Sequence, residues 1–430
     1  MTELAVLVAG KLCAYVTDAG GTQRLKYVEC DQDGLPPATI SLSMPVRQEG
    51  YGGGVVSNWL WNLLPDNAIT LDWLAKDESR GFGKCSARNP LRLLEKIGED
   101  CAGAVQLVPL ESVDKLSPGS LTPLTDREVE LKLQGLRTGR SPLGFLPSGD
   151  NGKFSLAGAQ PKVALRVLQD GIWAIPTGAE PTSHIFKPPI PDMPGQVEGE
   201  HFCLTLARAT GLKTPQSWVM RFGDEVAIVV ERFDRRLDTF SGKLLRLHTE
   251  DICQALGKPP TEKYQSDGGP GMIQIVNLLR KTSITSEEDV FSFVMACVFN
   301  WAIGGTDAHA KNYSLFLGEK NAAALTPLYD LNTFLPYAEH PNRCKLSMIV
   351  SGHYSIGDIH LRHWDDMAAR MGWEHDSLSG YVETYVNLMT ELIAPIAKDC
   401  IDSGLSEEAI SFVTDAIRSR LVGLIESWKR

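Results

Sequence analysis

The sequence has few of the features that mark secreted or membrane-spanning proteins. Its nine cysteines are scattered singly and form no C-x-x-C pair, which is typical of a reducing compartment where cysteine is a small buried hydrophobe. The first residues, Met1-Thr2-Glu3, lack the basic segment of a secretory signal, and no apolar run reaches the ~20 residues that a membrane helix needs. We therefore expect a soluble, cytoplasmic protein with no membrane partner.

The sequence also lacks an excess of positive charge and a zinc-binding pattern. Its formal net charge is −11 at pH 7, which argues against a free-standing nucleic-acid binder, because phosphate backbones require a basic face. His360 and His363 are the only close histidine pair, and without a third ligand nearby they are more typical of a surface or a helix end than of zinc. Any contact with DNA is therefore expected to come through a partner.

The residues that are present suffice for a large folded core. The 430 residues, 43% of them hydrophobic, have room for two or three domains. Residues 1–110 are expected to form a small α+β module with strands such as Leu4–Val8 and helices such as Pro90–Ile97. A linker rich in Ser, Pro and Thr leads to a second run of strands. These strands are predicted at Phe154–Leu156, Val163–Val167, Ile172–Ile175 and His184–Lys187.

The rest of the chain is mostly helical. A helix is predicted near Val197–Thr210, and from Ser286 onward helices dominate, with one interruption between Ala308 and Thr333. Strands, a helix, further strands and then helices are the order of a two-lobed, protein-kinase-like α+β fold with a mixed α/β N-terminal lobe and a mostly α-helical C-terminal lobe. The last helices carry apolar residues at three- and four-residue spacing, which predicts a bundle. They are expected at Asp365–Met371, Leu378–Ile396 and Glu407–Trp428.

The most informative stretch is Thr306-Asp307-Ala308-His309-Ala310-Lys311-Asn312. Asp307 and Asn312 are five residues apart, and Asp330 follows eighteen residues after Asn312. Phosphoryl transfer needs these residue types, because one carboxylate orients the attacking hydroxyl while an amide and a second carboxylate hold Mg²⁺ on the phosphates. We predict that Asp307 is the catalytic base and that Asn312 and Asp330 are the metal ligands. His309 and Lys311 are expected beside ATP, where they stabilise charge or the loop.

A second requirement is a loop over the phosphates. The segment Ser155–Lys162 places small residues between two strand patterns, so that backbone N–H groups can approach anionic oxygens. It is neither a Walker A loop nor a G-x-G-x-x-G motif, and a plain β-turn has the same local sequence. The small residues Ala157, Gly158 and Ala159 are the candidates for contact with phosphate.

A third requirement is a lysine on the phosphates with a carboxylate to pair with it. Lys187 ends an apolar strand, although a strand end that faces solvent is the commoner place for lysine. Glu200 is the predicted partner because it shares a helix face with Cys203 and Ala207, and Glu198 is its nearest competitor.

The segment Val226–Arg235 is the candidate for adenine binding. It is an apolar strand that turns abruptly charged, which suits a hinge where the backbone groups of Glu231 and Phe233 meet the adenine edge. A strand that simply leaves the core would have the same local pattern.

Taken together, these segments resemble the HipA family of bacterial serine/threonine protein kinases, which act as toxins in toxin–antitoxin pairs. The resemblance covers essentially the whole chain. It rests on Asn62–Asp66, Gly103–Pro109, Ser155–Lys162, Lys187, Val230–Arg235, Lys263–Gly271, Thr306–Asn312 and Tyr329-Asp330. It implies an N-terminal subdomain at 1–110, a kinase N-lobe at 111–235 and a helical C-lobe at 236–430. It also implies that Leu156, Ala157, Gly158, Ala159 and Gln160 contact ATP.

The resemblance also implies a biological role. Ser155 is the expected autophosphorylation site, where a phosphate would repel the phosphates of ATP and inhibit the enzyme. The expected substrate is an aminoacyl-tRNA synthetase, with glutamyl-tRNA synthetase as the first candidate, and its phosphorylation would arrest growth. The expected partner is a HipB-like helix-turn-helix antitoxin that supplies most of the contact with operator DNA. A small-molecule kinase of similar fold and a non-catalytic co-repressor subunit are the alternatives.

Overall fold

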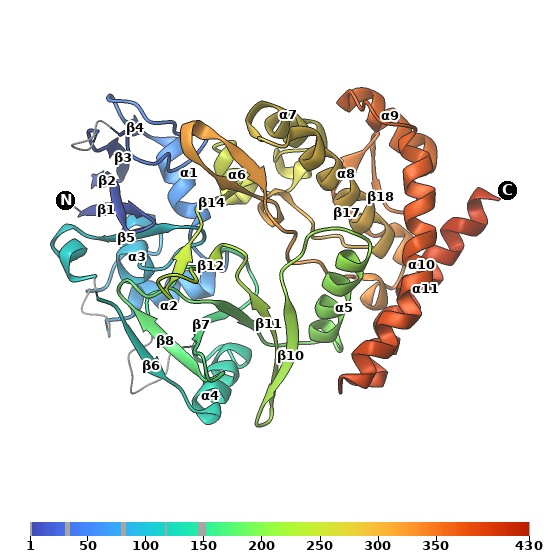
Figure 1. The fold of residues 1–430 in the computed structure, drawn as a ribbon, viewed down its shortest axis with the longest axis horizontal. Coiled ribbons are helices and arrows are strands. Elements are labelled where there is room, and N and C mark those ends of the chain that lie inside the picture. The colour runs from blue at the N-terminus through green and yellow to red at the C-terminus, as the bar shows by residue number, and fades with distance from the viewer. Residues whose placement is uncertain (1, 31–34, 79–82, 117, 145–151, 430) are drawn as a thin grey trace. The chain divides into compact units, whose positions relative to one another are not determined.

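The computed structural model describes residues 2–429, with gaps at 31–34, 79–82, 117 and 145–151 (Figure 1). The chain folds into two compact units, each built from several segments. The first unit comprises Met1–Pro188, Met220–Pro260 and Ser314–Ala323, and the second comprises Pro189–Val219, Thr261–Tyr313 and Ala324–Arg430. The division of the chain into three parts at residues 110 and 235 stays a prediction.

The first unit begins with an antiparallel five-stranded sheet in the order β4-β3-β2-β1-β5. Alternation decides its faces: in β3, Leu25 and Tyr27 are buried while Arg24 and Lys26 are exposed. Three helices share one apolar core with the buried face. The elements are β1 (Thr2–Val8), β2 (Lys11–Ala19), β3 (Thr22–Tyr27), β4 (Tyr51–Gly52), α1 (Gly54–Asn62), α2 (Ala68–Lys76), α3 (Pro90–Ile97) and β5 (Val105–Pro109).

The second sheet of this unit has the order β10-β11-β9-β7-β8-β6. Phe186, in the centre of the sheet, is fully buried in one core with Val129 and Leu133 of helix α4. The strands predicted at Val163–Val167 and His184–Lys187 are confirmed as β7 and β9. The elements are β6 (Ser120–Pro123), α4 (Asp126–Arg137), β7 (Val163–Val167), β8 (Trp173–Thr177), β9 (His184–Lys187), β10 (Ser217–Phe222) and β11 (Glu225–Glu231).

Smaller elements follow in the first unit, and the last of them, β16, begins at Ala323 and continues into residues of the second unit. A two-stranded hairpin, β12–β13, follows β11, and β14, β15 and β16 form a three-stranded sheet. The elements are β12 (Arg235–Leu237), β13 (Leu244–Arg246), β14 (Thr249–Asp251), α6 (Ile252–Ala255), β15 (Ser314–Leu317) and β16 (Ala323–Leu325).

The strand predicted at Phe154–Leu156 is wrong. Phe154 forms only an isolated parallel bridge with Asp100. The backbone N–H of Ser155 donates to the carbonyl of Asp100 at 3.0 Å, and its hydroxyl donates to the carbonyl of Leu63 at 2.6 Å. The segment is extended, but its polar groups are bonded to the N-terminal part of the unit instead of a strand ladder.

The second unit is mainly helical, as expected from the C-terminal sequence. Helix α8 is buried on nearly all sides, and the left-handed Gly304 ends it (φ 67°). Helices α10 and α11 pack along each other (Figure 1), and no helix among the described residues combines the length and apolarity needed to cross a membrane. The helices are α5 (Gln196–Ala209), α7 (Met272–Thr282), α8 (Ser286–Ile303), α9 (Leu361–Met371), α10 (Leu378–Asp402) and α11 (Glu407–Trp428).

The predicted interruption between Ala308 and Thr333 is too short. Helix α8 ends at Ile303 and the next α-helix begins at Leu361. Between them lie β15, β16 and a further hairpin of β17 (Lys345–Val350) and β18 (His353–Ser355). The hairpin has no clear sequence signal, because β17 is buried at most positions and so lacks a clean alternation of apolar and polar residues. Helix α7 also had no counterpart among the predicted elements.

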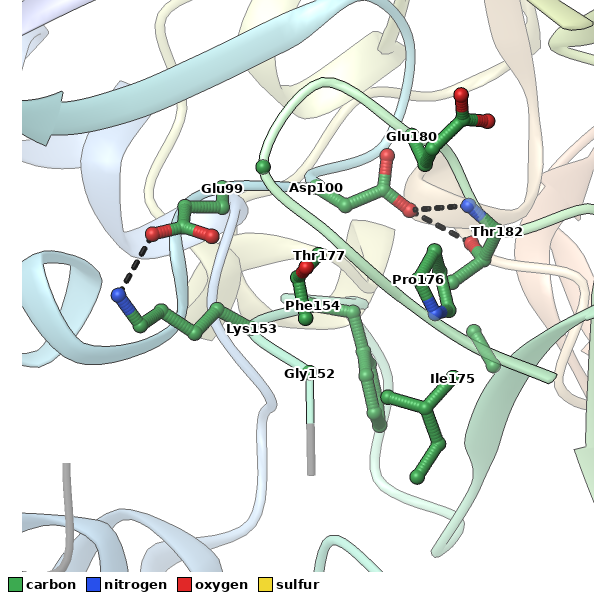
Figure 2. A pocket seen from close by; sticks show the side chains of 12 residues that line it. Glu99, Asp100, Gly152, Lys153, Phe154, Ile175, Pro176, Thr177, Glu180 and Thr182 are labelled. Carbon is green, nitrogen blue, oxygen red and sulfur yellow. Dashed lines mark hydrogen bonds and ion pairs between the residues drawn. The ribbon is translucent and has the colours of Figure 1, made fainter. Parts of the chain in front are cut away.

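A buried cluster of charges ties the first unit together. Asp100 accepts hydrogen bonds from Arg235 (2.8 Å), Arg246 (3.0 Å) and Arg232 (3.2 Å). It also accepts from the backbone N–H and hydroxyl of Thr182, at 3.1 and 2.6 Å (Figure 2). Although burial raises the pKa of Asp100, the three arginines outweigh it and hold this pKa well below its usual range.

A second carboxylate completes this cluster. Asp234 accepts hydrogen bonds from both Nε and Nη2 of Arg232, at 3.0 and 2.7 Å, and from the backbone N–H of Gly103 at 2.6 Å. Arg235 lies 3.1 Å from the same carboxylate. The cluster therefore connects the end of the N-terminal module with the segment that follows β11.

Removal of Asp100 should be strongly destabilising, because it leaves three buried guanidinium groups without their shared carboxylate. We expect Asp100→Asn to lower the free energy of unfolding by about 3–5 kcal/mol, as measured by urea denaturation. The matched control is Glu78→Gln, which removes an exposed ion pair with Lys84 in the same unit and should cost less than about 1 kcal/mol. Equal losses in the two variants would contradict this assignment.

Candidate active site

The predicted catalytic loop is a tightly bonded segment of the second unit. The main-chain carbonyl of Asp307 accepts hydrogen bonds from the backbone N–H of His309 and from Nδ2 of Asn312, both at 2.8 Å. A single 3₁₀ turn covers Ala310–Asn312. The hydroxyl of Tyr329 donates to the carbonyl of Lys311 at 2.8 Å, which fastens the segment before Asp330 to the loop. The structure therefore brings Tyr329 into contact with Lys311, eighteen positions earlier in the sequence.

Charges from four side chains act on His309, which lies at the centre of this loop. Burial lowers the pKa of His309 to about 4. Asp307 and Asp330 oppose this shift, whereas Lys263 and Lys311 add to it. His309 Nε2 lies 4.0 Å from Oδ1 of Asp307, yet the imidazole side chain is only 6% exposed while that carboxylate is 48% exposed. The imidazole is therefore neutral at pH 7, whereas the carboxylate of Asp307 remains open to solvent.

Asn312 and Asp330 would supply an oxygen donor set that fits Mg²⁺. Asn312 is buried and its amide nitrogen is bonded to Asp307, which leaves the amide oxygen available. Asp330 has a left-handed backbone (φ 59°), a strained conformation for a residue other than glycine. Groups of three or more His, Cys, Asp or Glu side chains that could hold a metal are absent from the described residues. One carboxylate with one amide suits Mg²⁺, which keeps waters and phosphate oxygens as its other ligands.

A buried atom of His309 also bears on whether this loop fits a ligand. Its Nδ1 is buried and lacks a hydrogen-bond partner within the described part of the chain. Buried polar atoms are nearly always bonded, so this atom fits a loop that completes its contacts when a ligand binds.

The predicted phosphate lysine lies in the first unit. Lys187 ends β9 and is 7% exposed, which excludes the solvent-facing strand end considered above. It is paired with Ile228 of β11. The next residue, Pro188, accepts a hydrogen bond from Nε2 of Gln160 at 3.1 Å. The lysine and the predicted phosphate loop are thus neighbours in one unit.

The predicted phosphate loop has the backbone freedom that close approach to an anion requires. Gly158 adopts φ 107°, and a Cβ there would lie 2.5 Å from Nζ of Lys162. Lys162 donates to the carbonyl of Ala157 at 2.8 Å, and the carbonyl of Gly158 accepts from the N–H of Asp66 at 3.1 Å. Ser155 is 1% exposed.

The predicted hinge contains a structural role that sequence reasoning missed. Glu231 ends β11 and is exposed, and Phe233 packs edge-on against Phe316 at 6.0 Å. The residues between and beyond them, Arg232 and Asp234, belong to the buried charge cluster. The signal is a charged run directly after an apolar strand, which the sequence-based prediction links to nucleotide binding alone.

Glu200 is placed on α5 of the second unit, whereas Lys187 belongs to the first unit. Glu200 is 1% exposed and lies within 3.5 Å of the amide nitrogen of Gln196, while its competitor Glu198 is only partly buried. Burial favours Glu200 over Glu198 as a functional carboxylate. Its pairing with Lys187 stays a prediction.

The fold and these residues define a protein of the kinase-like class, and comparison with known proteins identifies its family. The model of the HipA-like C-terminal domain matches residues 154–398, and that of the HipA N-terminal domain matches residues 4–108. The chain belongs to the HipA family, and the expected enzyme class, a serine/threonine protein kinase, is confirmed with it.

Individual relatives cover most of the chain. A putative kinase, Y4mE, from Sinorhizobium fredii is 32% identical over 95% of this chain and 96% of its own length. The serine/threonine-protein kinase toxin HipA of Shewanella oneidensis is 30% identical over 76% of this chain and 73% of its own length. A solved complex of Shewanella oneidensis HipA, HipB and operator DNA has a TM-score of 0.76 at 24% identity and covers 99% of this chain and 98% of that one. The predicted two-lobed kinase-like fold is confirmed.

The state of His309 gives a pH prediction. Because its pKa is about 4 in the folded protein and about 6.5 in an unfolded chain, its stabilising contribution is complete above pH 6.5 and is lost as the pH falls toward 4. The loss should be at most about 3 kcal/mol, and His309→Gln should remove it. Proton NMR of the imidazole should show a midpoint near 4, whereas a midpoint near the ordinary value would contradict the burial argument.

Proposed function

We propose that this protein transfers the γ-phosphoryl group of ATP to serine or threonine hydroxyls of a protein substrate. The observation that carries the proposal is the exposure of Asp307 beside the buried side chains of His309 and Asn312. Its carboxylate is 48% exposed, whereas its neighbour His309 is 6% exposed and Asn312 is buried. A substrate hydroxyl can therefore reach this carboxylate, which would orient it and accept its proton.

The remaining residues divide the other tasks of the reaction between them. Asn312 and Asp330 would hold Mg²⁺, whose charge neutralises phosphate oxygens when it is bound. Lys187 would bind the phosphates together with backbone groups of Leu156–Gln160, and the backbone at Glu231 and Phe233 would hold the adenine. Lys311 lies on the same loop as Asp307 and adds positive charge near the site of transfer.

The buried position of Ser155 supports the proposal that autophosphorylation inhibits the kinase. Its side chain is 1% exposed and its hydroxyl is bonded to the carbonyl of Leu63. A phosphate of about −2 charge cannot occupy this buried position, so phosphorylated Ser155 would have to leave it together with the loop. Autophosphorylation would therefore remove the phosphate loop from its place and inhibit the enzyme.

The relatives support a proposal for the cellular role. Shewanella oneidensis HipA is a kinase toxin and is found with HipB and operator DNA. We propose the same arrangement here, with a HipB-like antitoxin as partner and with DNA bound mainly through it, which agrees with the net charge of −11. An aminoacyl-tRNA synthetase is the proposed substrate, and glutamyl-tRNA synthetase is the first candidate.

Two substitutions test the reaction. Expression of the wild type should arrest growth, and Asp307→Ala and Asp330→Ala should each abolish the arrest, because the base or the metal ligand is lost. In extracts with labelled ATP, both variants should label protein at least about 100-fold more slowly. The control is Asp415→Ala, an exposed carboxylate in the same unit, which should behave as the wild type.

The alternatives give different results in the same assay. A labelled metabolite without a labelled protein would indicate a small-molecule kinase. Growth arrest that persists in Asp307→Ala would show that phosphoryl transfer is not the cause, as for a non-catalytic co-repressor.

A further inference from the structure

The segment Lys263–Gly271 carries one of the family motifs, and the reaction described above gives it no task. It lies in the second unit, between the 3₁₀ turn Pro260–Glu262 and helix α7. The carbonyl of Lys263 accepts a hydrogen bond from the N–H of Ala310 at 3.2 Å. The motif is therefore fastened directly to the catalytic loop.

Tyr264 makes the most specific contacts in this motif. Its hydroxyl donates a short hydrogen bond to Oδ1 of Asp307. Its ring meets the ring of His309 edge to face, with centroids 5.0 Å apart at 84°, and Nζ of Lys263 lies 5.5 Å from the centre of the same ring. The tyrosine thus contacts both the predicted base and the buried histidine beside it.

The glycines of the motif explain how the backbone presents this tyrosine. The carbonyl of Tyr264 accepts from the N–H of Gly269 at 2.9 Å and from that of Asp267 at 3.0 Å. A Cβ on Gly269 would lie 2.2 Å from the carbonyl oxygen of Glu262 and 2.6 Å from that of Tyr264, so no other residue fits there without a shift of the backbone. These contacts fix the backbone at Tyr264 and therefore the position from which its side chain extends.

Asp307 needs such a restraint. Its side chain is 48% exposed, and rotation of a carboxylate about its last bond is loosely restricted. Within the described residues, the two contacts of this carboxylate, from Tyr264 and from His309 at 4.0 Å, both go to Oδ1. Oδ2 is therefore the oxygen left to face a substrate hydroxyl.

We propose that Tyr264 is a positioning residue, which holds Oδ1 of Asp307 so that Oδ2 is aligned with the substrate hydroxyl. The inference rests on the proposed kinase function. Alignment of a reacting group contributes to the rate of the chemical step and not to the affinity for ATP. Tyr264 itself exchanges no proton with the substrate.

The test is Tyr264→Phe, which removes the hydroxyl and keeps the ring against His309. With extract protein as substrate and labelled ATP, we expect kcat to fall about ten-fold or more, as befits one lost hydrogen bond to a charged group. The KM for ATP and the thermal unfolding midpoint should stay at the wild-type values. Tyr264→3-fluorotyrosine, which retains the hydroxyl, should restore most of kcat.

The matched control is Tyr385→Phe, which removes a buried tyrosine hydroxyl bonded to Thr210 at 2.6 Å in the same unit. It should leave kcat unchanged. If the wild type transfers no phosphate to protein, the proposed function fails and this inference fails with it. If the wild type is active, an unchanged or increased kcat in Tyr264→Phe overturns this inference alone, as does a loss of kcat accompanied by a lowered unfolding midpoint.

Discussion

Two buried carboxylates, Asp100 and Asp234, share the guanidinium groups of Arg232 and Arg235 at the centre of the first unit. Charges taken out of water are costly unless every one has a partner, so this cluster tolerates little displacement. It joins the N-terminal module, through Asp100, to the residues that directly follow β11. The segment proposed to bind adenine is therefore held in place by Asp100, which lies more than 130 residues earlier in the chain.

In the second unit, hydrogen bonds to the main chain hold the catalytic loop in place. Its catalytic loop is held by hydrogen bonds to the main chain of Asp307 and Lys311, which leave the acidic side chain of Asp307 partly in solvent. Burial keeps His309 neutral beside it, so the loop carries less positive charge than its sequence suggests. The loop is thus rigid in its backbone and open at the one carboxylate that has to meet a substrate.

The sequence predicts the elements whose signals are local. The bounds of β7, β9, α3 and α11 agree with the predicted ones because apolar periodicity, a proline at a first turn or a serine cap lies within each segment. The strand predicted at Phe154–Leu156 failed because its hydrogen-bond partners are more than 50 residues away.

The residues of the candidate site also differ in whether their signals are local in the sequence. The roles of Asp307 and Asn312 are predicted from their spacing, because both lie on one loop. The structural task of Arg232 and the contact of Tyr264 with Asp307 depend on partners 43 or more residues distant, and a single sequence carries no local signal for such pairs. Only the resemblance to a family singles out the motif around Tyr264.

Phosphoproteomics after brief induction tests the central claim most directly, with Asp307→Ala as the comparison. The account predicts new phosphoserine or phosphothreonine sites that appear with the wild type and are absent with the variant, on a synthetase and on Ser155 of the protein itself. Identical phosphoproteomes in the two strains, at equal expression, would contradict the claim that this protein is a protein kinase that acts through Asp307.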